Sequence, residues 1–319
     1  MADDDIGGVW RTVGGRRIFI KDGTDLKTAM EQSGKFKRAD KGKTRGEMVK
    51  DIKGKDELYQ KKMAEKKTKE NKNPFKKAVD EKEKVIDREK SNELKEFKKE
   101  KLDEEKVRDR GGLTREEARE ASKEAERIYG IAEKVEPQIS KDLIDSVSKY
   151  DGKMYGLDFR LKQPTSLAGK IGADFKESKG SGATMGMYAD NIKDAVRYTA
   201  ILNENNFVKE YNGIKADLEN KGYKEFRCKN FYKMYNEDKS CQKAIQCVYE
   251  NKDGYKFELQ FHTNNSQGAK DVNHLDLKLY DRYREATTSR GEKVALYGQM
   301  CEIAELVRNP DEIYTIKEH

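Results

Sequence analysis

The sequence predicts an α/β (α+β) fold: a mixed β-sheet flanked by helices in the C-terminal domain, preceded by a long charged helical stalk and a short N-terminal hairpin. Charged residues make up 40% of the 319 residues and hydrophobic ones 34%, so a core cannot extend along the whole chain. Residues 1–149 hold nearly all the excess positive charge, whereas residues 150–319 are almost neutral. Residues 255–262 alternate strictly between apolar and polar side chains, which is typical of a half-buried strand. The core is therefore expected in the second half.

Residues 1–36 are predicted to form a small docking tag. A glycine pair separates two short apolar runs, 9–13 and 17–21, which indicates a hairpin. A short helix is expected to follow and to end at Ser33. Because an isolated two-stranded hairpin is only marginally stable, we expect a partner to complete this tag.

Residues 37–110 are predicted to form a charged helical or partly disordered stalk. Opposite charges stand three and four residues apart in this segment, a spacing that supports a solvated helix. Positive and negative charges alternate along the stalk, so their electric fields largely cancel and give little support to a nucleic-acid contact. Such a contact is kept only as an alternative. Residues 111–149 are predicted to form a helical lead-in of two helices, the first running from a Thr114–Glu117 capping box to Tyr129.

Several classes of protein are not expected from this composition. No stretch approaches the roughly 20 apolar residues that a membrane-spanning helix requires. The N-terminus lacks the basic start and apolar run of a signal peptide, so none is expected. Four cysteines without a Cys-x-x-Cys pair, and only three histidines, predict reduced thiols rather than a zinc site or a disulfide framework.

Residues 150–319 are predicted to be the folded domain, because strand and helix patterns mix there. The expected strands cover 195–202 and 255–262. The expected helices cover 208–221, 274–287 and 292–307.

A basic group near the start of this domain suits a polyphosphate. Arg160 and Lys162 lie on one side of an expected extended segment, and Ser166 and Lys170 follow one helical turn apart. Such a group can hold phosphate oxygens. Each cation taken alone fits an ordinary surface charge better than a ligand-binding role.

Two carboxylates occupy positions suited to chemistry. Asp194 opens an expected strand, where a carboxylate can hold Mg²⁺ against a phosphate. Glu258 is placed in mid-strand, on the face of Gln260 and His262, although strands disfavour Glu. A general base or a metal ligand would account for it. An ordinary turn aspartate and a solvent-facing strand side remain the alternatives.

Five segments, in this order, resemble the RelA/SpoT-type synthetase domain, particularly the version found in phage and polymorphic-toxin proteins. The resemblance extends from Glu136 to His319. The segments are EPQIS at 136–140, GLDFRLKQPTSLAGKI at 156–171, DAVRYT at 194–199, FELQFHT at 257–263 and HLDLKLYDRYR at 274–284.

In that family a pyrophosphate group passes from ATP, with Mg²⁺, to a hydroxyl of a nucleotide or of RNA such as tRNA. The resemblance implies that Asp194 and Glu258 are the catalytic and metal-binding residues, Asp194 holding Mg²⁺ and Glu258 activating the acceptor hydroxyl or sharing the metal. The substrate-binding residues it implies are Arg160, Lys162, Ser166, Lys170, Arg197, Gln260, His262 and His274.

The sequence departs from the family at one motif. Family members carry, upstream of the strand glutamate, a tyrosine that stacks on the acceptor base, whereas this chain has Gln242-Lys-Ala-Ile-Gln246 there. The donor half of the site is therefore predicted to be intact. Two outcomes are therefore predicted. Either the acceptor is recognised through a part other than its base, such as an RNA end, or the domain is inactive.

Residues 9–23 and 29–36 resemble a tag on phage minor head proteins, which implies that the chain binds phage head proteins and resides in the virion or the host cytoplasm. The leading hypothesis is a phage head-associated protein with a toxin-type pyrophosphokinase domain. A catalytically degenerate minor head protein and a nucleic-acid-binding stalk protein are the alternatives.

Overall fold

The computed structural model describes residues 8–13, 16–21, 73–94, 96–177, 182–233, 241–285 and 287–319. The chain divides into two compact units, Met1–Lys69 and Glu70–His319, and each is considered by itself. Within the described ranges, no helix combines the length and the apolar character that crossing a bilayer requires.

The first unit contains the predicted hairpin. Strands β1 (Gly8–Val13) and β2 (Arg16–Lys21) pair antiparallel, which confirms this part of the prediction. The helix expected before Ser33 and residues 37–72 of the expected stalk lie outside the described residues.

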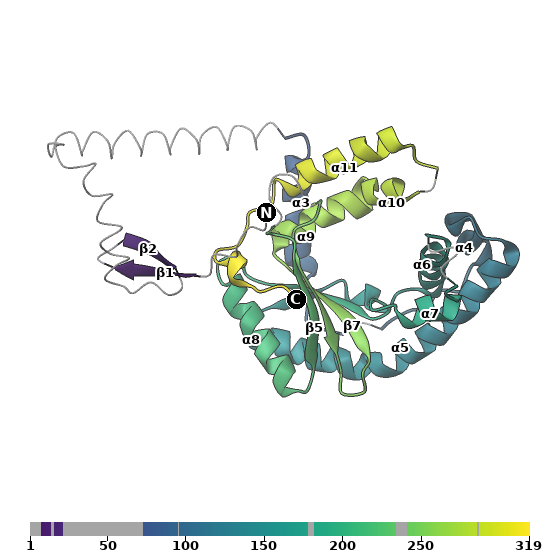
Figure 1. Ribbon diagram of the computed structural model, residues 1–319, viewed down its shortest axis with the longest axis horizontal. Coiled ribbons are helices and arrows are strands. Elements are labelled where there is room, and N and C mark those ends of the chain that lie inside the picture. Colours follow the sequence, from purple (N-terminus) through teal and green to yellow (C-terminus); the bar gives the residue numbers. More distant parts are fainter. Residues whose placement is uncertain are drawn as a thin grey trace. The chain divides into compact units, whose positions relative to one another are not determined.

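The second unit is built around one five-stranded mixed sheet flanked by helices, as the sequence predicts (Figure 1). The strands lie in the order β3-β4-β7-β6-β5, and only β4 and β7 pair in parallel. Strands β4 and β7 are the two strands expected from the sequence. The strands are β3 (Lys153–Tyr155), β4 (Arg197–Ile201), β5 (Lys224–Asn230), β6 (Ile245–Glu250) and β7 (Lys256–His262).

One face of the sheet carries the main hydrophobic core, covered by α5 (Arg115–Lys149) and α8 (Phe207–Asn220) (Figure 1). Phe257 and Phe261 of β7 are fully buried on this face. Tyr211 of α8 meets Phe261 edge to face, with ring centroids 5.0 Å apart, a favourable arrangement of two aromatic quadrupoles. The opposite face of β7 is left for polar side chains.

Helix α5 is one continuous helix of 35 residues, so the prediction of two separate helices is wrong. It begins at the predicted capping box, in which Glu117 N donates to Thr114 Oγ1 at 3.2 Å and Thr114 N donates to Glu117 Oε2 at 2.7 Å. Pro137 lies inside the helix without ending it. The fully buried side chains of Ala132 and Ile139, on either side of Pro137, anchor both halves in the core, and this packing overrides the local preference.

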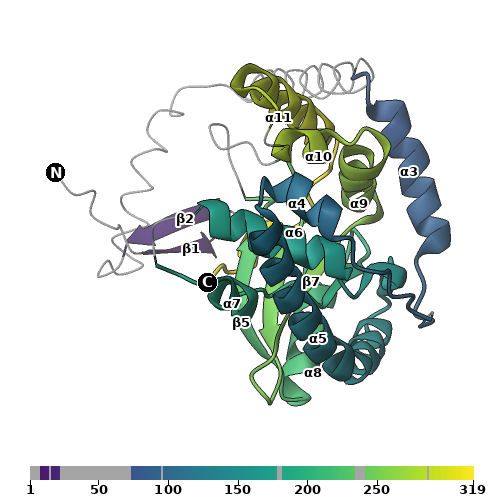
Figure 2. The ribbon, with the colours of Figure 1, turned by 90° about the vertical axis from the view of Figure 1, so that its right-hand side faces the viewer.

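The charged segment before α5 needs a correction. Residues 73–110 were expected to be part of a solvated stalk, but α3 (Lys76–Glu89) packs on α9 (Asn264–Asp271) (Figures 1 and 2). Val79 and Ile86, two turns apart, are 1% and 0% exposed. A Cβ added to Gly268 of α9 would lie 3.2 Å from a backbone nitrogen of α3, so glycine permits the close approach. Two apolar residues on one side of α3 are enough to pack it on α9, because Gly268 lets the two helices approach closely.

The remaining helices form two groups beyond the sheet (Figures 1 and 2). Helix α11 matches one expected helix, whereas the helix expected over 274–287 is broken into a π-helical turn followed by α10. The first group is α4 (Glu104–Gly111), α6 (Pro164–Glu177) and α7 (Met185–Asp190). The second is α9, the π-helical turn Val272–Asp276, α10 (Leu279–Arg284) and α11 (Arg290–Ala304). Short 3₁₀ turns occupy Leu157–Phe159 and Ile313–Thr315.

Candidate active site

The candidate site forms around the parallel pair of strands, β4 and β7. Their register places Arg197 opposite Glu258 and Thr199 opposite Gln260. Residues paired in this way project from the same face of a sheet, because side chains alternate along each strand in step. These polar groups therefore share the face that points away from Phe257 and the main core.

Asp194 lies just before β4 and is held by two lysines. Its two carboxylate oxygens accept hydrogen bonds from Lys162 Nζ and Lys170 Nζ, each at 2.6 Å. Burial by itself would raise the pKa of the Asp194 carboxyl, but the charges of the two lysines outweigh burial and hold this pKa well below its usual range. Asp194 is therefore ionised at neutral pH.

Local backbone pairing brings the basic group to this end of β4. Leu161 forms an isolated antiparallel bridge with Val196, which sets Lys162 beside the entry to the strand. Ser166 and Lys170 lie one turn apart on α6, as the sequence predicts. Burial lowers the pKa of the Lys162 ammonium, although Asp194 opposes the effect.

Two carboxamides fix the carboxylate of Glu258. Gln260 Nε2 donates to one oxygen at 2.6 Å, and Gln246 Nε2 of β6 donates to the other. Glu258 is only 8% exposed. The alternative of a solvent-facing strand side is therefore wrong, and the expectation of a half-buried strand is corrected: both faces of β7 are covered, one by apolar and one by polar groups.

Gln260 links Glu258 to a second layer of the network. Its Oε1 accepts a hydrogen bond from Lys270 Nζ at 2.7 Å and lies 3.3 Å from His262 Nε2. His262 Nδ1 lies 3.0 Å from Ser266 Oγ on α9. Full burial and the charge of Lys270 lower the pKa of His262 well below its usual value, so the imidazole is neutral. A neutral ring with a partner at each nitrogen holds Gln260 in one orientation.

Lys270 is a site residue that the sequence analysis missed. Burial lowers the pKa of its ammonium to about 8, against the opposing charges of Glu258 and Asp271. Strongly perturbed groups of this kind cluster at functional sites. In a chain with 67 lysines and arginines, a lysine on a helix gives no distinguishing signal. Only the packing of α9 beside β7 reveals it.

Arg197 connects the two halves of the site. Its charge contributes to lowering the pKa of Lys162 on one side and the pKa values of Lys270 and His274 on the other. Such effects decrease with distance, so Arg197 lies within electrostatic range of all three groups, and its register places it opposite Glu258. Its side chain is exposed, and its Nε donates to Phe159 O at 3.5 Å. The structure thus brings together the predicted residues around Asp194 and those around Glu258.

Arg160 lies apart from this group of exposed and half-buried cations. It is 5% exposed, and its Nε donates to Glu136 Oε1 at 2.7 Å while an Nη1 donates to Leu157 O at 2.9 Å. Its guanidinium also lies 5.6 Å from the ring centroid of Phe97. The expectation that Arg160 and Lys162 act side by side needs this qualification, because the Arg160 guanidinium turns inward to α5.

The segment that replaces the family's acceptor motif reaches the site in another way. Gln246, at its end, lies on β6 directly opposite Gln260 and donates to Glu258. An amide that orients the carboxylate therefore stands near the position where the family carries its stacking tyrosine. The resemblance implies that this segment lacks the stacking ring, and the fold shows that Gln246 contacts Glu258 instead.

Asp194 and Glu258 both offer carboxylate oxygens, the ligands that Mg²⁺ prefers. They come from neighbouring paired segments, since Glu258 N donates to Val196 O at 3.0 Å. The donor set fits a magnesium ion bound together with phosphate oxygens. That the two carboxylates share one ion stays a prediction.

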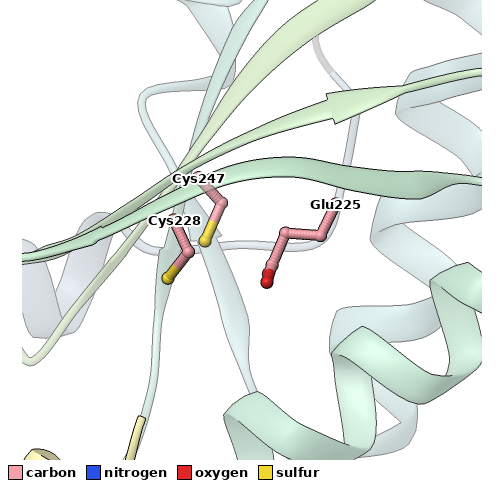
Figure 3. A group of neighbouring side chains, drawn as sticks. All are labelled: Glu225, Cys228 and Cys247. Atoms are coloured by element: carbon pink, nitrogen blue, oxygen red, sulfur yellow. The ribbon is translucent and has the colours of Figure 1, made fainter. Parts of the chain in front are cut away.

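A second buried polar cluster lies between β5, β6 and α8 (Figure 3). Ligand atoms of Glu225, Cys228 and Cys247 lie within 4.8 Å of one another, and both cysteines are free thiols. Burial raises the pKa of the Cys247 thiol well above its usual value. Glu225 accepts hydrogen bonds from Tyr211 at 2.9 Å and Lys215 at 2.6 Å. The carboxylate is satisfied by these donors, and the cluster serves as a structural tie.

Comparisons with known proteins add a distant likeness. No family model and no curated protein matches the chain. Among solved structures, the chain is similar to one in the crystal structure of the complex between the type VI effector Tas1 and its immunity protein. The identity is 17% and the TM-score 0.38, over 58% of this chain and 96% of that chain. A likeness at this level does not bear on the function.

Proposed function

We propose that residues 150–319 form a toxin-type, RelA/SpoT-like pyrophosphokinase that transfers a pyrophosphoryl group from ATP to a hydroxyl of a nucleotide or RNA. The observation that carries the proposal is the Lys162–Asp194–Lys170 group, which adjoins the hydrogen-bonded carboxylate of Glu258. The sequence motifs that resemble the family supply the reaction class. Phosphoryl chemistry requires cations, a metal-binding carboxylate and a positioned acceptor, and these residue types are the ones gathered here.

On the donor side, Lys162 and Lys170 would move from Asp194 to the phosphate oxygens of ATP, with Ser166 and Arg197 as further donors. Asp194, freed from the lysines, would hold Mg²⁺, which when bound neutralises the phosphate charge. The ion pairs hold the lysines near the phosphate position before ATP arrives. Arg160, held by Glu136, is assigned a positioning role in this scheme.

On the acceptor side, Glu258 would take the proton of the attacking hydroxyl. The hydroxyl oxygen forms a bond to the β-phosphorus of ATP, the bond from that phosphorus to the bridging α–β oxygen breaks, and AMP leaves. Gln246 and Gln260 fix the direction of the carboxylate, and Lys270 offers a cation next to the reacting groups. His262 and His274 support this side as neutral rings.

The rival proposal is a degenerate domain with a structural role only. The replacement of the family's stacking tyrosine by the Gln242–Gln246 segment favours it. The two proposals differ in one measurable property, turnover of ATP in the presence of an acceptor.

The test is incubation of the full chain with Mg²⁺, labelled ATP and a panel of nucleotides and tRNA, with chromatography of the products. The proposal expects AMP release in step with label on one acceptor, and loss of both in Glu258→Gln. Label transfer that survives Glu258→Gln, or its absence with every acceptor despite tight ATP binding, would favour the degenerate domain or another mechanism.

For the N-terminal unit we propose, from sequence resemblance alone, that the β1–β2 hairpin docks onto phage head proteins. The hairpin has two strands, and an isolated two-stranded hairpin is only marginally stable in water. Residence in the virion is tested by mass spectrometry of purified particles. Absence of the chain from particles of its phage would remove this role and leave the enzymatic proposal untouched.

A further inference from the structure

The backbone between α9 and α10 is irregular in a way that concerns the site. Helix α9 runs directly into the π-helical turn Val272–Asp276, and Lys278 then adopts a positive φ of 50°. Single π-helical turns are frequent at functional sites, and left-handed lysine is a strained conformation that the surrounding structure must enforce. The segment carries His274 and leads into α10.

This irregular connection brings a ring on the turn against a ring on α10. His274 and Tyr280 lie with centroids 4.4 Å apart and planes inclined by 31°. The guanidinium of Arg284, one turn further along α10, lies 5.7 Å from the Tyr280 centroid. Leu275 and Leu277, 59% and 38% exposed, add apolar surface on the same connection. We call His274, Tyr280 and Arg284 the α10 platform.

Arg284 differs from its neighbour on the same helix. Arg282 is tied to Glu292 of α11 at 2.7 Å, whereas the exposed Arg284 has no carboxylate within ion-pair distance among the described residues. The exposed Arg284 guanidinium lies 5.7 Å from the centroid of the Tyr280 ring, on which it can cover a bound group.

The α10 platform adjoins the acceptor side of the proposed site. His274 is within electrostatic range of both Lys270 and Arg197, and burial together with their charges lowers its pKa to about 4. At neutral pH the imidazole is thus uncharged and presents an aromatic face without repelling the neighbouring cations. The position that the family gives to its stacking ring holds Gln242–Gln246 instead, so a stacking surface has to come from elsewhere.

We propose that the α10 platform binds the base of the acceptor, which is an unpaired nucleobase attached to the ribose that receives the pyrophosphate. Tyrosine, histidine and arginine planes are the groups on which unpaired bases stack, and stacking tolerates different bases because every base has a π face. The base would lie against Tyr280, and Arg284 would close over it. This inference rests on the proposed function for the identity of the reaction, but base binding can be measured without it.

The acceptor could be a free mononucleotide or the end of an RNA strand, and the experiment separates these sources. The full chain and its variants are titrated by calorimetry with AMP, with GMP and with a short single-stranded RNA. Transfer from labelled Mg·ATP is followed with the same three probes. The variants are Tyr280→Ala, Tyr280→Phe and Arg284→Ala. Tyr283→Ala is the control, since Tyr283 packs on Tyr297 of α11 with centroids 6.1 Å apart and is outside the platform.

We expect Tyr280→Ala to weaken binding of the preferred probe about tenfold to hundredfold, the loss typical of one stacked base. Tyr280→Phe retains the ring and should bind like the unmodified chain, which a role of the hydroxyl would not predict. Arg284→Ala, a change at an exposed residue, should weaken binding without affecting folding. ATP affinity should stay unchanged in all variants, and Tyr283→Ala should bind the probes normally.

Unchanged probe affinity in Tyr280→Ala and Arg284→Ala, with folding verified by circular dichroism, would overturn the platform. So would an equal loss in Tyr280→Phe. If the probes bind through Tyr280 but no label is transferred, the platform stands and the pyrophosphokinase proposal fails. If label is transferred with the same acceptor KM in Tyr280→Ala, the pyrophosphokinase proposal stands and the platform fails.

Discussion

The two halves of the candidate site are built from different interactions. Around Asp194, two full positive charges meet one full negative charge at 2.6 Å. Around Glu258, two neutral carboxamides donate the hydrogen bonds, and Lys270 donates to Gln260. The donor half is thus held by ion pairs. The acceptor half is a hydrogen-bonded relay whose cation has a pKa of about 8 and therefore responds to pH.

This difference has a physical reason. Two lysines beside one carboxylate leave a net positive charge, which suits a ligand as highly charged as ATP. The amides of Gln246 and Gln260 orient the Glu258 carboxylate without bringing an opposite charge to it. The contrast leads to five expectations.

Replacing Glu258 by Gln should abolish transfer, by about a thousandfold or more, because removing a general base or metal ligand costs on the order of 10²–10⁴ in rate. ATP binding should persist, since the donor half stays intact. Calorimetry with Mg·ATP and a transfer assay measure the two effects. Glu250→Gln, at the end of β6 in an ion pair with Lys256 at 2.6 Å, is the matched control. Loss of ATP binding in Glu258→Gln would show that the halves are not separable.

Asp194→Asn should weaken Mg·ATP binding by about a hundredfold, because it removes one partner of a half-buried charge group. Acceptor binding should remain, and calorimetry with each ligand measures both. Asp190→Asn, which changes an exposed aspartate bonded to Arg127 at 2.6 Å, is the control from the same region. An Asp194→Asn variant that binds Mg·ATP normally would contradict the donor assignment.

Lys270 should make transfer dependent on pH. Its ammonium is lost as pH rises through about 8, so activity should fall about tenfold per unit above that value if the cation is required. Lys270→Arg stays charged at high pH, so its transfer rate should fall less steeply with pH. ATP affinity should not fall over the same pH range. A decline that is identical in Lys270→Arg would assign it to another group.

The same residue predicts the sign of a stability change. The folded pKa of Lys270, about 8, lies below the value of about 10.4 for a free lysine. Between these values the unfolded chain binds more protons, so Lys270 makes stability rise with pH in that window. Urea unfolding at pH 8 and pH 10 should show this rise in the unmodified chain and a smaller one in Lys270→Met.

The smallest effect concerns the support behind the acceptor half. Gly268→Val should destabilise the fold by about 1–3 kcal/mol through overpacking against α3. Lys270 lies on the same helix, so acceptor affinity should fall more than ATP affinity. Gly298→Val in α11, where an added Cβ meets nothing within 4 Å, is the control. Equal loss of both affinities would mean that α3 supports the whole domain evenly.

The sequence supported some of these elements better than others. The alternation along β7 predicts its apolar face, and the Thr114–Glu117 spacing predicts the start of α5, because both are local patterns. The polar residues Gln260 and His262 were recognised with Glu258 for the same reason. Lys270 and Tyr280 were missed, since nothing in their immediate neighbours distinguishes them from the many other charged and aromatic residues of helices.

By itself, the sequence determined that the C-terminal domain is a mixed sheet flanked by helices, and which residues have the chemistry for phosphate and metal. Composition, alternation and capping are properties of neighbouring residues, and they are fixed before the chain folds. The tertiary structure decided that α3 packs on α9, that Arg160 turns inward to Glu136, and that α9 sets Lys270 beside β7. These contacts join residues far apart in the chain, and their energies depend on burial and on partners that no local pattern specifies.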